Sequence, residues 1–304
     1  MKRILMILIL LAAIAFGAYA ACRYYQDEYL PEQKKQQDIE RTAVLFEDVR
    51  PEQELPTESR ENHEESGSEL EESIEIPETA GNQDSETVPD DAVYVVHDTY
   101  DVYDASAIPD DLPEVILAED DLLETGKQLN SDMIGWIVIP DTDIDYPIVW
   151  CDNNDFYLDH GLDKEPNQLG VPFLDYKCEP DFSGFNSIVY AHNMEWVLLF
   201  AEVYRFKTPS YLWAHPYGWL TVGTETHRVD FFAYLTVPDG SDAYQTIFIT
   251  DSEKADYLEY LREHSVHTLN QPPQEELLKS RLLLLSTCTF EYKNARGILA
   301  GVIR

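Results

Sequence analysis

The C-terminal stretch LLLLSTCTFEYKNARGILAGVIR, residues 282–304, combines two apolar runs with reactive and charged side chains. Four leucines lead into Ser286, Thr287 and Cys288, and Arg296 opens the second apolar run. Two short apolar runs separated by turn-forming residues indicate a β-hairpin. Because the ends of paired strands lie side by side, the pattern predicts that Cys288 and Arg296 are neighbours.

A thiol beside a base and a permanent cation is a candidate nucleophile. The thiolate is the reactive form, and attack on a carbonyl needs a donor where the oxyanion forms. Arg296 stays protonated at working pH and offers several donors in one plane. The segment SIVYAHNM places His192 just past another predicted strand. Taken singly, each has a structural alternative: Cys288 in the core, His192 as a strand-end histidine, and Arg296 in a surface ion pair.

Five other histidines compete with His192 for the role of base: His160, His215, His227, His264 and His267. Cys288 likewise has three companions, Cys22, Cys151 and Cys178. In an exported chain they invite a disulfide interpretation. No CxxC pair accompanies them, so we expect no metal, and we expect Cys151 and Cys178 to be small buried side chains.

The region from Pro113 onward has the pattern of a globular domain made mainly of β-strands. Helical periodicity predicts helices only over 119–130, with Leu122, Leu123 and Leu129 on one face, and over 252–265. Many short strands with few helices favour an antiparallel barrel or sandwich. No GxGxxG or P-loop is present, so we expect no cofactor. The predicted strands include Met133–Ile139, IDYPIVW, GVPFLDY, SIVYAH, LTVGTETHRVDFFAYLTV, TIFI, LLLLSTC and GILAGVI.

The formal net charge of −37 is concentrated before this domain. Residues 51–91 hold fifteen acidic residues and one cation, Arg60. Such a segment buries too little apolar surface to offset its ordering entropy, so it predicts a disordered linker. Its negative charge repels a polyanion, so we expect no nucleic-acid partner.

The N-terminus has the features of a membrane anchor. Residues 4–22 carry no charge and follow Lys2 and Arg3, which predicts one transmembrane helix with the rest outside the cytoplasm. A cleaved signal peptide is the alternative, because Ala18-Tyr19-Ala20 fits a cleavage site. We therefore predict a signal anchor at 1–22, a juxtamembrane and acidic disordered linker at 23–112, which includes a frayed helix within 23–50, and a catalytic domain at 113–304.

The motifs resemble those of the sortases, extracytoplasmic cysteine transpeptidases of Gram-positive bacteria, and most closely those of class B. Tyr190-Ala191-His192-Asn193-Met194 is similar to the family's YGHNM-like block, and Arg296 matches the family arginine. The segments over 134–150 and 154–176 resemble the upstream GWI, IDYPV, DNxYYL and GxxFxDY blocks, and the helix at 252–265 suggests class B. The family's TLxTC motif falls on Leu284, Leu285, Ser286, Thr287 and Cys288, with a leucine for the first threonine.

The resemblance implies a closed β-barrel of about eight strands with a few short helices. It also implies that Cys288 cleaves a C-terminal sorting signal through a thioacyl-enzyme, with His192 as general acid and base and Arg296 as oxyanion and substrate stabiliser. The implied partners are exported proteins with such a signal and an amine of peptidoglycan or of a pilin. The implied substrate-binding residues are Asn154, Leu158, Tyr190, Ser286 and Thr287.

Two departures and two rivals accompany this interpretation. Residues 195–200, EWVLLF, differ from the family's Met-Phe pair, and the acidic Glu291 follows Cys288 only after two other residues. A papain-like secreted peptidase is disfavoured because there the cysteine precedes the histidine. A membrane-tethered binding domain without enzymatic activity suits the acidic linker equally well.

Overall fold

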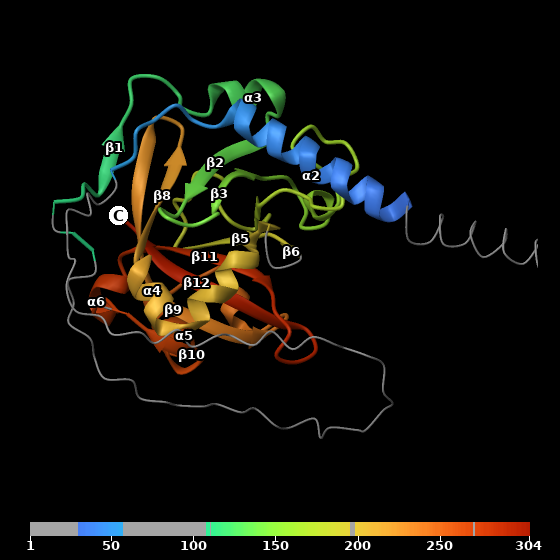
Figure 1. Cartoon of the computed structure of the whole chain (residues 1–304). Helices are drawn as coiled ribbons and strands as arrows, with labels where there is room; N and C mark the ends of the chain where they lie inside the picture. Colours follow the sequence, from blue (N-terminus) through green and yellow to red (C-terminus); the bar gives the residue numbers. More distant parts are fainter. Residues whose placement is uncertain (1–29, 57–107, 110, 195–197, 270) are drawn as a thin grey trace, which may run out of the picture.

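The computed structural model describes residues 30–56, 108–109, 111–194, 198–269 and 271–304 (Figure 1). The predicted signal anchor and most of the predicted acidic linker lie outside these residues. No helix in the described part is long and apolar enough to cross a membrane.

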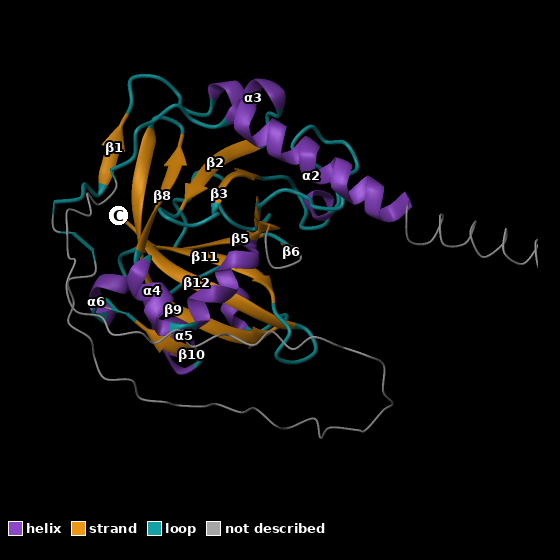
Figure 2. Cartoon of the chain, viewed as in Figure 1, coloured by secondary structure: helices purple, strands orange, loops and turns teal. Residues whose placement is uncertain are grey.

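The core of the fold is a closed barrel of eight strands (Figure 2). Neighbouring strands follow the order β9-β12-β11-β5-β4-β3-β2-β8, and β8 pairs back onto β9 to close the ring. This confirms the predicted mainly-β barrel. The strands are β2 Met133–Val138, β3 Asp145–Val149, β4 Phe173–Leu174, β5 Asn186–Tyr190, β8 Tyr217–Val222, β9 Glu225–Pro238, β11 Arg281–Cys288 and β12 Ala295–Ile303.

Two pairs depart from the antiparallel expectation, because β3 runs parallel to β4 and β5 runs parallel to β11. The second of these pairs sets the position of His192, as described below. Strands β1 Val115–Leu117 and β10 Ser265–Thr268 extend the sheet on β9, and β6 Asn193–Met194 pairs with β7 Leu198–Leu199 in a separate hairpin.

The helices are short apart from two. They are α2 Leu30–Val49, α3 Glu124–Leu129, α4 Pro209–Ala214, α5 Asp251–Glu263 and α6 Gln274–Leu277, with single 3-10 turns or short 3-10 helices at η2 Phe156–Leu158, η3 Phe200–Lys207 and η4 Asp242–Tyr244. Helix α5 confirms the prediction at 252–265, and it begins at a capping box formed by Thr250 and Glu253.

The helix predicted at 119–130 is present only as α3. The Asp121 side chain accepts from the Leu123 backbone N–H, and the Leu122 N–H donates to the Gly223 carbonyl, so the first residues turn instead of coiling. Leu123 is buried, but Leu129 is exposed, so the predicted apolar face is incomplete.

The strand predicted at TIFI, 246–249, is wrong. The backbone N–H groups of Ile249 and Thr250 both donate to the Glu253 side chain at the start of α5, so they are not available to a strand. The side chains of Ile247 and Ile249 are mostly exposed. This segment is the loop that leads from η4 into α5.

Strand β11 separates two apolar clusters. Leu283 and Leu285 belong to the larger cluster, to which strands from around the ring contribute and which fills the barrel. Leu282 and Leu284 belong to the second, which lies outside the barrel wall beneath α5 and includes Tyr257, Leu258 and Leu261 of that helix. All four leucines are fully buried. The alternation follows from the period of two in a strand.

Helix α2 packs on the barrel, although its residues fall within the segment predicted as a linker. Phe46 and Val49 are buried in the larger cluster, and the Phe46 ring lies 5.9 Å from that of Tyr146. Arg50 forms an ion pair with Asp145. The helix predicted within 23–50 is therefore present over Leu30–Val49, and residues 30–56 are part of the folded body.

Candidate active site

The barrel brings the three candidate catalytic residues together at the ends of adjacent strands: two lie on paired strands, and the third follows the next strand. Cys288 is the last residue of β11 and lies opposite Arg296 on β12. On the other side, Ser286 of β11 lies opposite Tyr190 at the end of β5. Continuing this parallel register by two residues places His192 level with Cys288. Neighbouring strands lie about 4.8 Å apart, so the backbones of the three residues, called the triad row below, are close neighbours.

Hydrogen bonds hold the alignment beyond the end of β5. The Ala191 backbone N–H donates to the Ser286 carbonyl at 3.2 Å, and the Asn193 side-chain amide donates to the Cys288 carbonyl at 3.0 Å. The Thr287 hydroxyl donates to the Ala191 carbonyl at 2.9 Å. His192 is therefore fixed beside Cys288 by contacts on both sides of it in sequence.

The triad row lies on the outer face of the barrel. Cys288 shares a strand face with Leu282, Leu284 and Ser286, and opposite residues in paired strands project from the same side. Ser286 is buried, whereas Cys288, His192 and Arg296 are each partly exposed. The thiol is therefore held by a buried strand and is accessible from outside.

One nitrogen of the His192 ring is already engaged. Nε2 lies 2.8 Å from the main-chain carbonyl oxygen of Leu158, at the end of η2. A carbonyl oxygen only accepts, so Nε2 is the protonated nitrogen in this contact. In the neutral ring the other nitrogen, Nδ1, is then free to accept a proton.

Arg296 is held by a carboxylate that no sequence motif marks. Its guanidinium forms an ion pair with Asp239 at 3.2 Å and donates to the Ala295 carbonyl. Glu291, in the loop that follows Cys288, pairs with Lys207 instead. Asp239 follows β9, whose Val237 is opposite Arg296, so the barrel itself brings the pair together.

The predicted substrate-binding residues lie around this row, and most of their polar atoms already have partners. Ser286 shares a hydrogen bond with Tyr244, and Tyr190 donates to Asp175 at 3.0 Å. Asn154 donates to the same carboxylate and accepts from the Tyr176 backbone N–H. The Thr287 hydroxyl is bonded as described above. The Leu158 side chain is exposed, and its main-chain carbonyl contacts His192.

Tyr244 contacts two residues of the candidate site, and sequence reasoning missed it. Its hydroxyl lies 2.9 Å from that of Ser286, and its ring stacks at 5.9 Å on that of Tyr190. Burial raises the pKa of its phenol, so the group stays neutral at working pH. It belongs to η4, just before the segment expected to be a strand, and no motif marks it.

The other described cysteines and the competing histidines have contacts that do not involve the candidate catalytic residues. The three described cysteines are free; burial raises the pKa of the Cys178 thiol to about 12 and also raises that of Cys151. Cys178 is buried as predicted, while Cys151 is only partly so. The competing histidines contact main-chain or acidic groups away from the row: His160 with Asp159, His215 with Pro140, His227 with Arg304, His264 with Tyr260 and His267 with Phe206.

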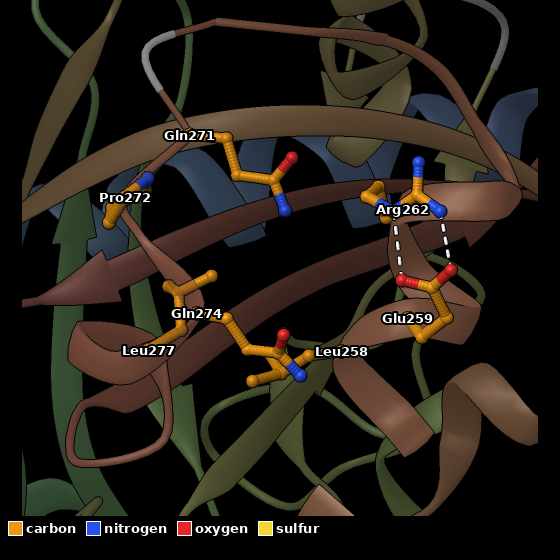
Figure 3. Close-up of a pocket in the computed structure, with 7 residues that line it drawn as sticks. All are labelled: Leu258, Glu259, Arg262, Gln271, Pro272, Gln274 and Leu277. Atoms are coloured by element: carbon orange, nitrogen blue, oxygen red, sulfur yellow. Dashed lines mark hydrogen bonds and ion pairs between the residues drawn. The ribbon is translucent and has the colours of Figure 1, made fainter. Parts of the chain in front are cut away.

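One pocket, of about 210 Å³, is lined by other residues (Figure 3). It lies between α5, α6 and the segment before α6, and the Arg262–Glu259 ion pair lines one side of it. None of the candidate residues lines it. Within the described residues, no group of three or more histidine, cysteine or acidic side chains has the arrangement of a metal site.

Comparison with known proteins gives the family. No protein-family model matches this chain. It is 34% identical to sortase B of Listeria monocytogenes over 183 residues, which cover 60% of this chain and 73% of the relative. The crystal structure of Clostridium perfringens sortase B matches with a TM-score of 0.56 and 27% identity, over 60% of this chain and 98% of that one.

The Staphylococcus aureus sortase B–substrate complex has the same fold, with a TM-score of 0.57 at 22% identity, over 61% of this chain and 87% of that one. The Listeria relative sets aside the non-enzymatic alternative, because sequence identity at this level extends over most of its length. Together with the barrel, these relatives show that the chain is a cysteine transpeptidase of the sortase family and belongs with its class B members.

Proposed function

We propose that Cys288, His192 and Arg296 are the catalytic residues of this sortase. The proposal is supported by the triad row: Cys288 lies opposite Arg296 on paired strands, and His192 follows β5, next to Asn193, whose amide donates to the Cys288 carbonyl. The thiol supplies a nucleophile, the histidine a proton carrier and the permanent cation an oxyanion donor.

In the first half-reaction, the Cys288 thiolate attacks the carbonyl carbon after a threonine in the sorting signal. A C–S bond forms, and Arg296 stabilises the negative charge on the oxygen. When the C–N bond breaks, His192 in its protonated form gives a proton to the leaving amine. The product is a thioacyl-enzyme.

In the second half-reaction, an acceptor amine attacks the thioester carbonyl and gives a proton to His192. The new C–N bond forms as the C–S bond breaks, and the thiolate returns. The proposed donors are exported proteins with a C-terminal sorting signal, and the proposed acceptor is an amine of peptidoglycan or of a pilin. The solved sortase B–substrate complex of S. aureus, which has the same fold, supports the binding of a substrate on this barrel.

The proposed setting is the outer face of the cell membrane. The uncharged segment at 4–22 would anchor the chain once, and the acidic segment that follows would extend the catalytic domain from it. Reversing the N-terminal charges tests the orientation of the anchor in the membrane. Replacing Lys2 and Arg3 with glutamates should make the barrel less accessible to protease added to intact cells.

Replacing the nucleophile tests the assignment directly. In the full chain, Cys288→Ala should abolish cleavage of fluorogenic peptides drawn from a library in which each peptide carries one threonine. Folding should persist, because the side chain is small and partly exposed. Cys151→Ala is the matched control and should cleave like the wild type. Cleavage retained in Cys288→Ala would refute the proposal.

A further inference from the structure

The contact between His192 and Leu158 assigns a function to a loop that carries no catalytic side chain. We infer that the Leu158 main-chain carbonyl is the positioning group for His192, and that the loop over 156–170, braced by helix α2, holds this carbonyl in place. The inference rests on the proposed catalytic function of His192. It concerns a residue that acts through another, because Leu158 contacts the ring and not the reacting atoms.

The chemical need for such a group follows from the two ring nitrogens. A general acid and base must present one defined nitrogen to the thiol, and the partner of the other nitrogen decides which one that is. The bond from Nε2–H to the Leu158 carbonyl, at 2.8 Å, leaves Nδ1 to exchange protons with the site. A neutral carbonyl fixes the ring without adding a negative charge beside Cys288.

The loop is folded so that the Leu158 carbonyl has little freedom. The end of the loop comes back past the 157–158 peptide at Gly170, where φ is +66°. A β-carbon there would lie 2.3 Å from the Tyr157 carbonyl oxygen and 3.0 Å from that of Leu158. The Val171 N–H also donates to the Tyr157 carbonyl at 3.1 Å. Only glycine lets the two segments approach this closely.

The Tyr157 side chain anchors the same peptide through its hydroxyl. Its hydroxyl donates to Asp132 at 2.7 Å and accepts from the buried Asn130 amide at 2.9 Å. The Asn130 amide also donates to the Leu162 carbonyl at 2.9 Å. Residues just before β2 therefore hold the first half of the loop.

Helix α2 holds the second half. The buried Asn167 side chain donates to the Thr42 hydroxyl at 2.8 Å, and the Gln168 N–H donates to Asp38 at 3.3 Å. Arg41 forms an ion pair with Asp163. These contacts join residues more than a hundred positions apart, and all of them meet the loop that carries Leu158.

Two glycine variants of the full chain test the positioning function. Gly170→Ala moves the 157–158 peptide, whereas Gly223→Ala imposes a similar strain, at φ +62°, where nothing lies within 4 Å of a β-carbon. Misplacing a catalytic group can cost about 100-fold, so Gly170→Ala should lower kcat at least about tenfold with KM nearly unchanged. Gly223→Ala should keep the wild-type kcat.

Nuclear magnetic resonance of ¹⁵N-histidine-labelled protein supplies a readout that does not depend on activity. In the wild type and in Gly223→Ala, the His192 ring should show a proton on Nε2 that exchanges slowly with water. In Gly170→Ala this protection should be lost. Equal kcat values in the two variants, or a protected Nε2–H in Gly170→Ala, would overturn the inference.

If Gly170→Ala does not fold, a second pair of variants tests whether the loop positions His192. Thr42→Val removes the α2 contact with Asn167, while Thr226→Val removes the 2.6 Å bond to Gln53, which ties the same N-terminal segment to β9. Only Thr42→Val should lower kcat and Nε2–H protection. Equal behaviour of the pair would overturn the inference, whereas cleavage surviving in Cys288→Ala would instead remove the proposed function.

Discussion

The two faces of strand β11 are buried to the same degree but by different parts of the molecule. Leu283 and Leu285 point into the barrel, where strands from around the ring surround them. Leu282 and Leu284 point outward, where a single helix, α5, and its neighbours cover them. The inner cover is a closed ring, and the outer cover is a layer with an edge.

This difference explains where chemistry can occur on an otherwise apolar strand. On the inner face, burial continues to Thr287, whose hydroxyl is satisfied by the Ala191 carbonyl. On the outer face, Tyr244 of η4 is the contact that reaches Ser286, and the next outward residue, Cys288, is partly exposed. The candidate site lies where the outer layer ends, and the inner face anchors the strand that presents the thiol.

Leucine truncations on the two faces give the largest expected change in stability. Leu→Ala in a core typically costs about 2–5 kcal/mol, depending on how far the surroundings relax. Leu285→Ala should be near the upper end, because the closed ring relaxes little. Leu284→Ala should be near the lower end, because α5 can shift toward the gap. Urea unfolding of both variants checks this, and equal losses would show that the two covers are equally rigid.

Arg296→Lys tests the outer face by activity. Losing an oxyanion donor typically costs about 10²–10³ in rate, and lysine supplies charge without the planar fork. Turnover should therefore fall at least about a hundredfold, with little change in substrate affinity. Labelling of Cys288 by iodoacetamide, measured in the same samples, should stay near the wild-type rate.

Asp239→Asn is the companion variant, because it weakens the ion pair without altering the guanidinium. If the ion pair with Asp239 only holds the Arg296 side chain in place in the free enzyme, this variant should retain most of the turnover. A fall of only a few-fold in Arg296→Lys would reduce Arg296 to the surface ion-pair residue of the structural alternative, and would place the oxyanion donor among backbone N–H groups or Lys293.

The features predicted from the sequence are those encoded by nearby residues. The hairpin of β11 and β12 follows from one continuous stretch, and the face of α5 follows from its own periodicity. The pairing of Cys288 with Arg296 was predicted for the same reason. The closure of the barrel was expected only from the family resemblance, because the pairing of β8 with β9 and of β5 with β11 is not visible in local pattern.

The features that were not predicted depend on distant contacts or on the backbone. The docking of α2 depends on Asn167 and Asp145, about a hundred residues away, and short polar contacts of this kind leave no periodic signal. The Leu158 carbonyl that binds His192 is a main-chain group, so its residue type carries no information about it. At 246–249, four residues are too few to distinguish a strand from an exposed apolar loop.

Polar substitutions at the end of β11 should produce a smaller difference between the faces. Thr287→Val leaves the buried Ala191 carbonyl without this donor, which costs about 1–3 kcal/mol. Ser286→Ala removes a bond to Tyr244 near the edge of the outer layer, where a typical net value is about 0.5–1.5 kcal/mol. Urea unfolding should rank the inner variant as the less stable, and the reverse order would contradict the distinction between ring and layer.

The smallest expected effect concerns the loop that follows Cys288, where Glu291 pairs with Lys207 of η3 at 2.9 Å. Burial alone raises the pKa of Glu291, but the hydrogen bond from Lys207 and the charge of that side chain offset it, and the pKa lies below the ordinary 4.5. Because the folded-state pKa is the lower one, the stabilisation is complete above about pH 4.5 and is lost as the pH falls through the folded value.

Lys207→Met should therefore cost no more than about 1 kcal/mol at pH 7, since the pair is partly exposed. The difference from the wild type should shrink at pH 3, which urea unfolding at the two pH values measures. A difference that does not change with pH would mean that Lys207 supports this loop by packing alone, and that the ion pair does not contribute to holding the turn between Cys288 and Arg296.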